Sequence, residues 1–376
     1  MKRINKNVLI IILLTISILL SVVLIHIKGN SLEQYYYEGD KLDVPTTNEA
    51  IKNIILMIGD GMGENHIIAG EIYKGEQLNI QQIEDKTYVR TNSLQGITDS
   101  AAASTAMSTG TKTRRGMLGK DRHGNNLENL LEYSHKNGLK TGIVCTQILN
   151  HATPAGFSVH NNYRYNHDKI AVSQIEAGID LMLGGGRKYF SKYKTKMKEN
   201  NIKWINSLSE IDNIDKDVKV IGTFADESIS KQEIRTSLSN MTATALSRLE
   251  NENGFFLMIE GSDIDSYSHK LNIIKMLEEV IDFDNAVKIA KEYVDIHPDT
   301  LLIVTADHET GGLDLSGVKS RDQLKDSLFT TKDHTGKNVL IFAYGKGSKD
   351  LIQYNLIDNT HIGKFIRQGI MNNIKK

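Results

Sequence analysis

The 376-residue chain has only one cysteine, Cys145, and almost no net charge. A single cysteine excludes an intrachain disulfide and a metal site built from thiolates. Because Cys145 ends the apolar run 142–145, we expect it to be a small buried residue. The 45 basic and 46 acidic residues nearly cancel, so no overall field attracts nucleic acid or acidic lipid. Any charged ligand must therefore be held by local groups.

The chain also lacks internal repeats and low-complexity tracts after residue 50. Its length is sufficient for one large α/β domain, which we place at residues 51–376. No Gly-x-Ser-x-Gly motif and no Ser-His-Asp context is present to activate a serine. The sequence therefore does not indicate a hydrolase of the catalytic-triad type.

One long apolar run lies near the N-terminus. Residues 8–27 carry no formally charged side chain, and this length can span a bilayer. Three basic residues precede it, which predicts that residue 31 onward lies outside the cytoplasm. The absence of a small-x-small cleavage site near residues 24–30 favours an uncleaved anchor to the cell membrane, with a cleaved signal and secretion as the alternative. Residues 1–28 are thus predicted to be a membrane anchor or signal segment, and residues 29–50 a juxtamembrane linker.

Short β-branched runs alternate with longer amphipathic segments in the rest of the chain. Most of the short runs are continuously apolar, as expected for central strands that are buried on both faces. Segments 232–251 and 277–294 have helical periodicity. This pattern predicts a three-layer α/β/α fold with a large, mostly parallel central sheet. The predicted strands are residues 53–58, 141–146, 181–183, 219–223, 255–259, 301–305 and 339–344.

Acidic residues follow three of these strands by one or two positions. They are Asp60, Glu260 and Asp307. In open α/β sheets the functional groups gather beyond the carboxyl ends of the strands. We therefore expect the three carboxylates to meet at one edge of the sheet.

The alanine-rich segment 99–107 is predicted to be a helix that begins at Asp99 or Ser100. Ser100 could be an ordinary N-cap residue. Alternatively, the helix N-terminus could bind an anion such as phosphate, with the serine placed to attack it. Since a serine hydroxyl is a weak nucleophile and no base is evident, we expect a metal ion to activate it.

Other polar clusters have the residue types of metal ligands. Asp265 and His269 are four residues apart and would share a face if a helix begins there. Histidine with aspartate suits zinc, whereas oxygen ligands suit magnesium. Six such segments in one chain indicate a multi-metal hydrolase site. The clusters are Asp60; Ser100; His151 with Thr153; Glu260 with Asp265 and His269; Asp307 with His308; and His334.

Together these segments resemble the alkaline phosphatase family. The resemblance covers roughly residues 53–345, and its most specific parts are 99–107, 260–269 and 305–312. It implies a metal-dependent enzyme that hydrolyses small phosphate monoesters through a phosphoserine intermediate and releases inorganic phosphate. It also implies two zinc ions and one magnesium ion, no nucleic acid partner, and a homodimer as the candidate assembly.

The resemblance further implies a role for each residue of the site. Ser100 is the expected nucleophile, and Arg164 is expected to grip the phosphate. Asp60, Asp307 and His308 would bind the zinc ion that activates Ser100. Asp265, His269 and His334 would bind the second zinc ion. Asp60, Thr153 and Glu260, together with His151, would form a third site that normally holds magnesium.

Two positions depart from one well-known bacterial form of the family. His151 replaces an aspartate, so the third site is expected to bind magnesium more weakly and to accept zinc. Ser266 replaces a lysine and offers the phosphate no cation, so faster product release is expected. Insertions between His308 and His334 are small or absent, which leaves the oligomeric state open.

Three other interpretations remain. A phosphodiesterase or a sulfatase of the same superfamily would share the sheet and some ligands. A sulfatase needs a modifiable Cys or Ser followed by Pro and Arg, which segment 99–103 lacks, and a diesterase usually has a threonine nucleophile. A membrane-tethered protein that binds phosphate or metal without chemistry is the third alternative, although it would not need Ser100.

Overall fold

The computed structural model describes residues 42–229 and 236–375, together with the single positions 15, 17, 19 and 21. Most of the predicted anchor and most of the predicted linker lie outside these residues, so both stay predictions. Within the described part of the chain, no helix combines the length and the apolar character needed to cross a membrane.

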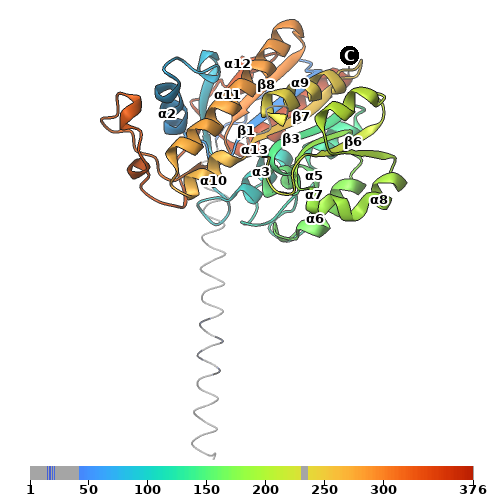
Figure 1. Ribbon diagram of the computed structural model, residues 1–376, viewed down its shortest axis with the longest axis horizontal. Coiled ribbons are helices and arrows are strands. Elements are labelled where there is room, and N and C mark those ends of the chain that lie inside the picture. Colours follow the sequence, from blue (N-terminus) through green and yellow to red (C-terminus); the bar gives the residue numbers. More distant parts are fainter. Residues whose placement is uncertain are drawn as a thin grey trace, which may run out of the picture.

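A ten-stranded sheet runs through the molecule with helices packed against it (Figure 1). Its strand order is β12-β2-β11-β8-β1-β7-β3-β4-β6-β5. All pairings are parallel except those of β11 with β2 and with β8. The strands are β1 (Asn53–Gly59), β2 (Lys86–Arg90), β3 (Lys140–Ile148), β4 (Leu181–Gly185), β5 (Ile202–Ile205), β6 (Lys219–Thr223), β7 (Phe255–Gly261), β8 (Thr300–Thr305), β11 (Val339–Gly345) and β12 (Leu356–Asp358).

Eight of the helices form two packed groups. One is centred on α11, which contacts α2, α9 and α10, and the other on α3, which contacts α4, α5 and α13. The helices are α2 (Glu64–Lys74), α3 (Ser100–Thr109), α4 (Leu130–Lys136), α5 (Ala152–Ser158), α6 (His167–Glu176), α7 (Arg187–Phe190), α8 (Lys194–Glu199), α9 (Leu238–Leu249), α10 (Asp263–His269), α11 (Ile273–Ile296), α12 (Ser348–Leu351) and α13 (Asn359–Ile374). The predicted α/β class with a large, mostly parallel sheet is confirmed.

The central strands form the core because helices exclude water from the sheet. Every residue of β1, β7 and β8 is buried. This burial explains why their sequences are continuously apolar rather than alternating. All seven predicted strands are present, and each observed end lies within two residues of its prediction.

The sequence patterns missed the strands with weaker signals. β2 alternates exposed and buried residues and contains charged side chains, while β5 and β12 are the short edge strands of the sheet. A separate two-stranded sheet joins β9 (Glu309–Thr310) and β10 (His334–Thr335). For the predicted helix 232–251, the structure shows α9 from Leu238 to Leu249, with Ser237 as its N-cap. Part of that predicted helix lies outside the described residues.

The register of the central strands brings the predicted carboxylates together. Ile58 of β1 lies opposite Glu260 of β7 and opposite Thr305 of β8. Since the three strands are parallel, their carboxyl ends meet at one edge, with Asp60 and Asp307 directly beyond. This edge is the starting point of the candidate site.

Candidate active site

Ser100 is the first residue of α3 and is almost fully buried. The N-cap is Asp99, whose Oδ1 accepts a hydrogen bond of 3.0 Å from the Ala102 amide. The Ser100 hydroxyl is therefore not needed as the cap. Its Oγ lies 3.4 Å from Nε2 of His308. The first turn of a helix also favours an anion at this point.

The first cluster of candidate metal ligands joins Asp60, Asp307 and His308, all fully buried. Nε2 of His308 lies 3.5 Å from Oδ1 of Asp60 and 3.3 Å from Oδ2 of Asp307. Oδ1 of Asp307 accepts hydrogen bonds from the amides of Gly61 and His308. Oδ2 of Asp307 and both oxygens of Asp60 have no hydrogen-bond partner among the described residues.

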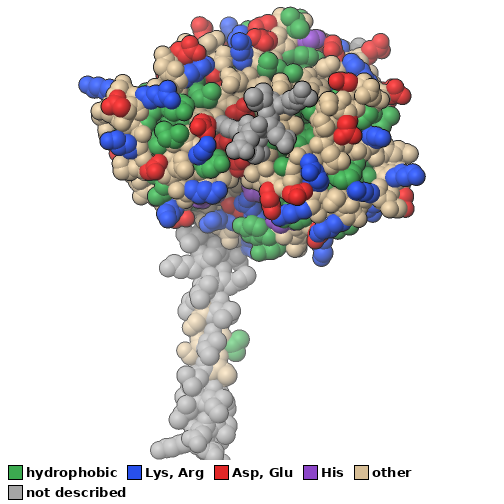
Figure 2. Space-filling model, viewed as in Figure 1, with side chains coloured by type: hydrophobic (Ala, Val, Ile, Leu, Met, Phe, Trp, Pro, Cys, Tyr) green, Lys and Arg blue, Asp and Glu red, His purple; other side chains and the backbone are tan. Residues whose placement is uncertain are grey.

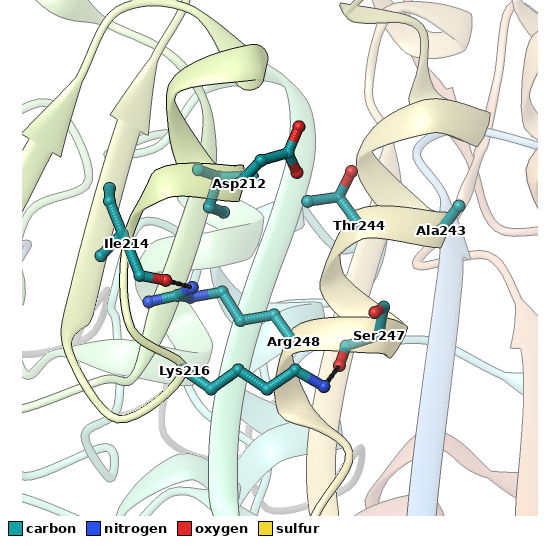
Figure 3. A pocket seen from close by; sticks show the side chains of 8 residues that line it. Asp212, Ile214, Lys216, Ala243, Thr244, Ser247 and Arg248 are labelled. Atoms are coloured by element: carbon teal, nitrogen blue, oxygen red, sulfur yellow. Dashed lines mark hydrogen bonds between the residues drawn. The ribbon is translucent and has the colours of Figure 1, made fainter.

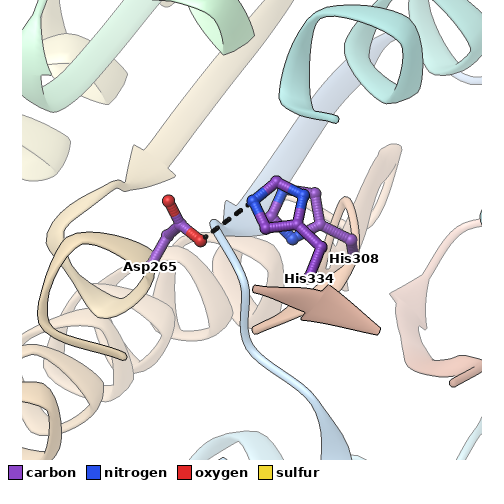
Figure 4. A group of neighbouring side chains, drawn as sticks. All are labelled: Asp265, His308 and His334. Atoms are coloured by element: carbon purple, nitrogen blue, oxygen red, sulfur yellow. Dashed lines mark ion pairs between the residues drawn. The ribbon is translucent and has the colours of Figure 1, made fainter. Parts of the chain in front are cut away.

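The second cluster joins Asp265, His308 and His334 (Figure 4). Nε2 of His334 lies 3.6 Å from Oδ1 of Asp265, and the His308 and His334 rings stack at 3.6 Å between centroids. His269 belongs to the same cluster, because its Nε2 lies 3.3 Å from Oδ1 of Asp265 and 3.1 Å from Nε2 of His334. Asp265 and His269 both lie on α10, as the i, i+4 spacing predicted.

The third cluster joins Asp60, His151 and Glu260. His151 directly precedes α5, whose second residue is Thr153. Among the described residues, Nδ1 of His151, Oγ1 of Thr153 and both carboxylate oxygens of Glu260 are buried without a hydrogen bond of normal geometry. Buried polar atoms are costly to leave unpaired, so these atoms are suited to bind a cation.

The histidines of the second cluster are oriented by their outer nitrogens. Nδ1 of His334 lies 2.9 Å from the carbonyl oxygen of Thr98, and Nδ1 of His269 bonds the carbonyl oxygen of Lys332. Nδ1 of His308 lies 3.1 Å from Oγ1 of Thr310, whose hydroxyl donates to Oδ1 of Asp265 at 2.5 Å. With the proton on Nδ1, each Nε2 can bind a metal ion. Sequence reasoning missed Thr310, since a threonine between two ligand segments gives no distinctive pattern.

Burial changes the acidity of the carboxyl groups. It raises the pKa of Asp60 well above its ordinary value, and the neighbouring Asp307 raises it further. Burial likewise raises the pKa of Glu260 to about 7 and that of Asp307 to about 8. Three carboxylates in such a small buried space need protons or cations to balance their charge. Carboxylate and imidazole groups at this spacing fit divalent metal ions.

Three other ligands, His151, His308 and Asp265, have lowered pKa values, whereas hydrogen bonding to Asp265 raises the pKa of His269. Burial lowers the pKa of His151 to about 3 and holds that of His308 well below its ordinary value. Burial opposes ionisation of Asp265, but hydrogen bonding to His269 and the nearby histidines outweigh it, so the pKa of Asp265 is lowered. Neutral histidines and an ionised aspartate are the protonation states that metal binding requires.

Arg164 reaches the site from a loop before α6. Its Nη1 donates to Oδ2 of Asp99 at 3.1 Å, and its Nη2 lies 3.4 Å from Nε2 of His151. Oδ2 of Asp99 also accepts from the Gly116 amide. Asp99 therefore has two functions, as the cap of α3 and as the partner of the arginine. Sequence reasoning found only the first, because the second depends on a contact across 65 positions.

Within each cluster the candidate ligand atoms lie within 4.8 Å of one another, and the clusters share Asp60 and His308. Thr153 adjoins the third cluster, because its hydroxyl acts on Glu260 and lowers the pKa of that carboxyl group against the larger effect of burial. Ser100 and Arg164 adjoin the clusters through their contacts with His308 and His151. The structure thus brings all the predicted site residues together. Ser266, the second departure, is half-buried on α10 between Asp265 and His269.

A cavity of about 450 Å³ elsewhere contains none of the predicted site residues (Figure 3). It lies between the 3-10 helix η3 (Leu208–Asn213) and α9. The guanidinium group of Arg248 in this cavity donates to the carbonyl oxygens of Ile214, Asp215 and Val218. Its donors are therefore engaged with the backbone rather than available for an anion.

Comparison with known proteins gives a consistent result. A family model described as alkaline phosphatase matches residues 51–325. Alkaline phosphatase 4 of Bacillus subtilis (strain 168) is 35% identical over 327 residues, which cover 80% of this chain and 71% of that protein. The alkaline phosphatase of Escherichia coli (strain K12) is 28% identical over 403 residues, which cover 84% and 85%.

Solved structures of similar fold include the alkaline phosphatase from the Antarctic bacterium TAB5. It superimposes with a TM-score of 0.78 at 30% identity and covers 86% of this chain and 98% of its own. A TAB5 mutant in which a histidine is replaced by aspartate, with Mg bound in the M3 site, has a TM-score of 0.79 at 31% identity and covers 86% and 99%.

Proposed function

The chain belongs to the alkaline phosphatase family, an enzyme family that hydrolyses phosphate monoesters, and from this premise we propose how its residues share the reaction. As a member it releases inorganic phosphate and binds divalent metal ions. The proposal concerns which residues act, which metals they hold and where the protein works. The observation that carries it is the set of buried carboxylate oxygens without partners beside Ser100.

We assign the metal ligands by cluster. Asp60, Asp307 and His308, with Oγ of Ser100, would hold one zinc ion. Asp265, His269 and His334 would hold the other, and Asp60, His151, Thr153 and Glu260 would hold a third ion, magnesium or zinc. Bound metal ions would lower the pKa of the hydroxyl groups that attack phosphorus and would balance charge on the leaving oxygen.

The protein groups then have separate tasks. Oγ of Ser100 attacks phosphorus, so that a phosphoserine forms and the alcohol leaves. Arg164, held by Asp99, grips two phosphoryl oxygens with its planar donors, and the N-terminus of α3 stabilises the same anion. Water subsequently hydrolyses the phosphoserine and restores the serine. Ser266 offers no cation at this site, which favours release of the phosphate product.

His151 sets the preference of the third cluster. A neutral imidazole in place of a carboxylate removes one negative charge and one oxygen ligand, which disfavours magnesium relative to zinc. The TAB5 mutant described above gained an aspartate in place of a histidine and has Mg in its M3 site. We propose that His151 occupies the equivalent place in this chain.

The proposal extends to the whole protein. Residues 51–376 would form the catalytic domain, and residues 1–28 would anchor it to the cell membrane with the active site outside the cytoplasm. A homodimer is the candidate assembly. We expect no nucleic acid partner, because the formal net charge is −1 and basic and acidic side chains are interspersed on the face that Figure 2 shows.

The test is hydrolysis of a chromogenic phosphate monoester by residues 31–376 between pH 6 and 10. We expect activity to disappear after chelation, to return with zinc and magnesium, and to rise with pH. A folded, metal-loaded Ser100→Ala protein should lose at least about a thousandfold in kcat. Normal turnover by that variant would exclude Ser100 as the nucleophile. Faster cleavage of a phosphodiester or a sulfate ester would identify one of the related activities instead.

A further inference from the structure

Two exposed tyrosines flank the arginine that is proposed to grip the phosphate. The exposed fractions of Tyr163 and Tyr165 are 54% and 60%. Their rings meet edge to face with 5.2 Å between centroids. The guanidinium carbon of Arg164 lies 5.5 Å from the centroid of the Tyr165 ring. We call this pair of rings the tyrosine shelf.

The loop that carries the shelf is held in place by its own hydrogen bonds. Asn161 exchanges two backbone hydrogen bonds of 2.9 Å with Leu118, and the Arg164 amide donates to the Gly116 carbonyl oxygen at 2.9 Å. The side-chain oxygen of Asn161 accepts from the Tyr163 amide and from the side chain of Asn166. The loop is therefore ordered by hydrogen bonds, and the two rings are exposed to solvent in the folded protein.

Two further rings adjoin the tyrosine shelf. The Tyr165 ring lies 6.3 Å from that of His167, which lies 5.2 Å from that of Tyr189 on α7. Single exposed apolar side chains are common on protein surfaces, but adjoining rings at a catalytic site are a recognised sign of ligand binding. The row of rings extends the aromatic surface beside Arg164 from Tyr165 to Tyr189.

We propose that the tyrosine shelf stacks against a planar ring of the leaving group, so that the preferred substrates are ring-bearing phosphate monoesters such as nucleoside 5′-monophosphates. The inference rests on the proposed role of Arg164. Because Tyr165 contacts that arginine, one ligand can place its phosphate on the guanidinium group and its ring on the shelf. Stacking on tyrosine requires only a flat π face, so it accepts any of the bases. An aliphatic leaving group such as glycerol gains nothing from it.

The experiment compares a nucleoside 5′-monophosphate, an aryl phosphate and glycerol phosphate as substrates of the metal-loaded enzyme. In the Tyr163→Ala/Tyr165→Ala variant, we expect kcat/KM for the nucleoside monophosphate to fall about tenfold relative to glycerol phosphate, mostly through KM. The double Phe variant should keep the parent ratio, since it keeps both rings. Tyr88→Ala is the control, because Tyr88 is an exposed tyrosine of β2 that bonds Glu64 instead.

The result for the aryl phosphate shows how far the stacked ring of the substrate lies from the ester oxygen. A parallel fall for this substrate supports stacking beside the ester oxygen, whereas an effect confined to the nucleoside monophosphate supports stacking one sugar away. An equal fall for all three substrates would mean that the tyrosines only position Arg164, and an unchanged ratio would mean that they bind nothing; either result overturns the inference. The single Tyr163→Ala variant, which spares the ring beside Arg164, repeats the comparison if the double variant is unstable.

The proposed function and the inference can fail separately. If the parent enzyme turns over none of the three substrates, the proposed function fails. The affinity of the Ser100→Ala protein for the nucleoside monophosphate relative to inorganic phosphate then still tests the shelf, because this ratio requires no turnover. A ratio that does not respond to removal of the two rings would overturn the inference.

Discussion

The buried carboxylate oxygens of Asp60 and Glu260 are the clearest indication of metal binding. Asp60 and Glu260 are fully buried, and none of their carboxylate oxygens has a normal hydrogen bond to a described residue. An unpaired buried carboxylate is unstable in its charged form, which is why burial raises both pKa values. A divalent ion removes this penalty more effectively than protons do near neutral pH. These oxygens are therefore suited to bind a divalent cation.

His151 provides a prediction at this scale. Replacement by aspartate adds a carboxylate to the third cluster, so we expect His151→Asp to raise the affinity for magnesium about tenfold or more. The measurement is a magnesium titration of metal-stripped protein, followed by activity and by thermal shift. His123→Asp is the matched control, because it adds the same charge at an exposed histidine. Equal magnesium affinities in the two variants would show that His151 does not face the third metal.

Among the secondary-structure elements, helix α3 positions both the candidate nucleophile and the arginine proposed to bind phosphate. Its first residue is the candidate nucleophile, and its cap, Asp99, also holds Arg164. The two functions of Asp99 use different oxygens, Oδ1 for the helix and Oδ2 for the arginine. Substitutions can therefore separate them.

We expect Asp99→Asn to keep the cap, because asparagine also caps helices, and to lose the charged partner of Arg164. Its melting temperature should fall less than that of Asp99→Ala, because only the hydrogen bonds to Oδ2, from the Gly116 amide and Arg164, are lost. The inhibition constant of inorganic phosphate should rise several-fold, because the arginine is less well held. Asp99→Ala should lose both functions, and loss of the cap costs about 1 kcal/mol of the free energy of unfolding. Thermal denaturation and phosphate inhibition measure the two effects. Equal phosphate inhibition in parent and Asn variant would contradict the role given to Asp99.

The whole molecule should respond to pH through these buried groups. Between pH 6.5 and 8 the folded, metal-free protein retains protons on Asp307 and Glu260, whose pKa values are raised to about 8 and about 7, whereas the unfolded chain has lost them near pH 4. The folded state thus binds more protons, so its free energy of unfolding decreases as pH rises through this window. Below pH 6.5 buried histidines with lowered pKa values, such as His151, oppose this trend.

The measurement is the melting temperature of metal-free and metal-loaded protein at pH 6.5 and pH 8. We expect the metal-free value to fall over this interval. Metal ions replace the protons, so the difference between loaded and stripped protein should grow with pH. A metal-free protein that becomes more stable from pH 6.5 to 8 would contradict the raised pKa values of the two carboxyl groups.

The central architecture and the identity of the candidate ligands could be predicted from the amino-acid sequence alone. Continuous apolar runs such as 53–58 and 255–259 are typical of strands that are buried on both faces of a sheet. Asp60 and Glu260 follow these two runs within two residues. The start of α3 was predicted to one residue, since an alanine-rich segment after Asp99 has few alternatives to a helix. These features depend on local composition and periodicity, which a sequence displays directly.

The contacts between residues far apart in the sequence could be identified only from the tertiary structure. The contact of Arg164 with Asp99, the bridge of Thr310 between His308 and Asp265, and the sharing of His308 by two clusters all join separate segments. The strand β12 likewise exists because β2 pairs with it. Such contacts are set by how the parallel strands align and how the helices cover them, and no local pattern in the sequence records that alignment.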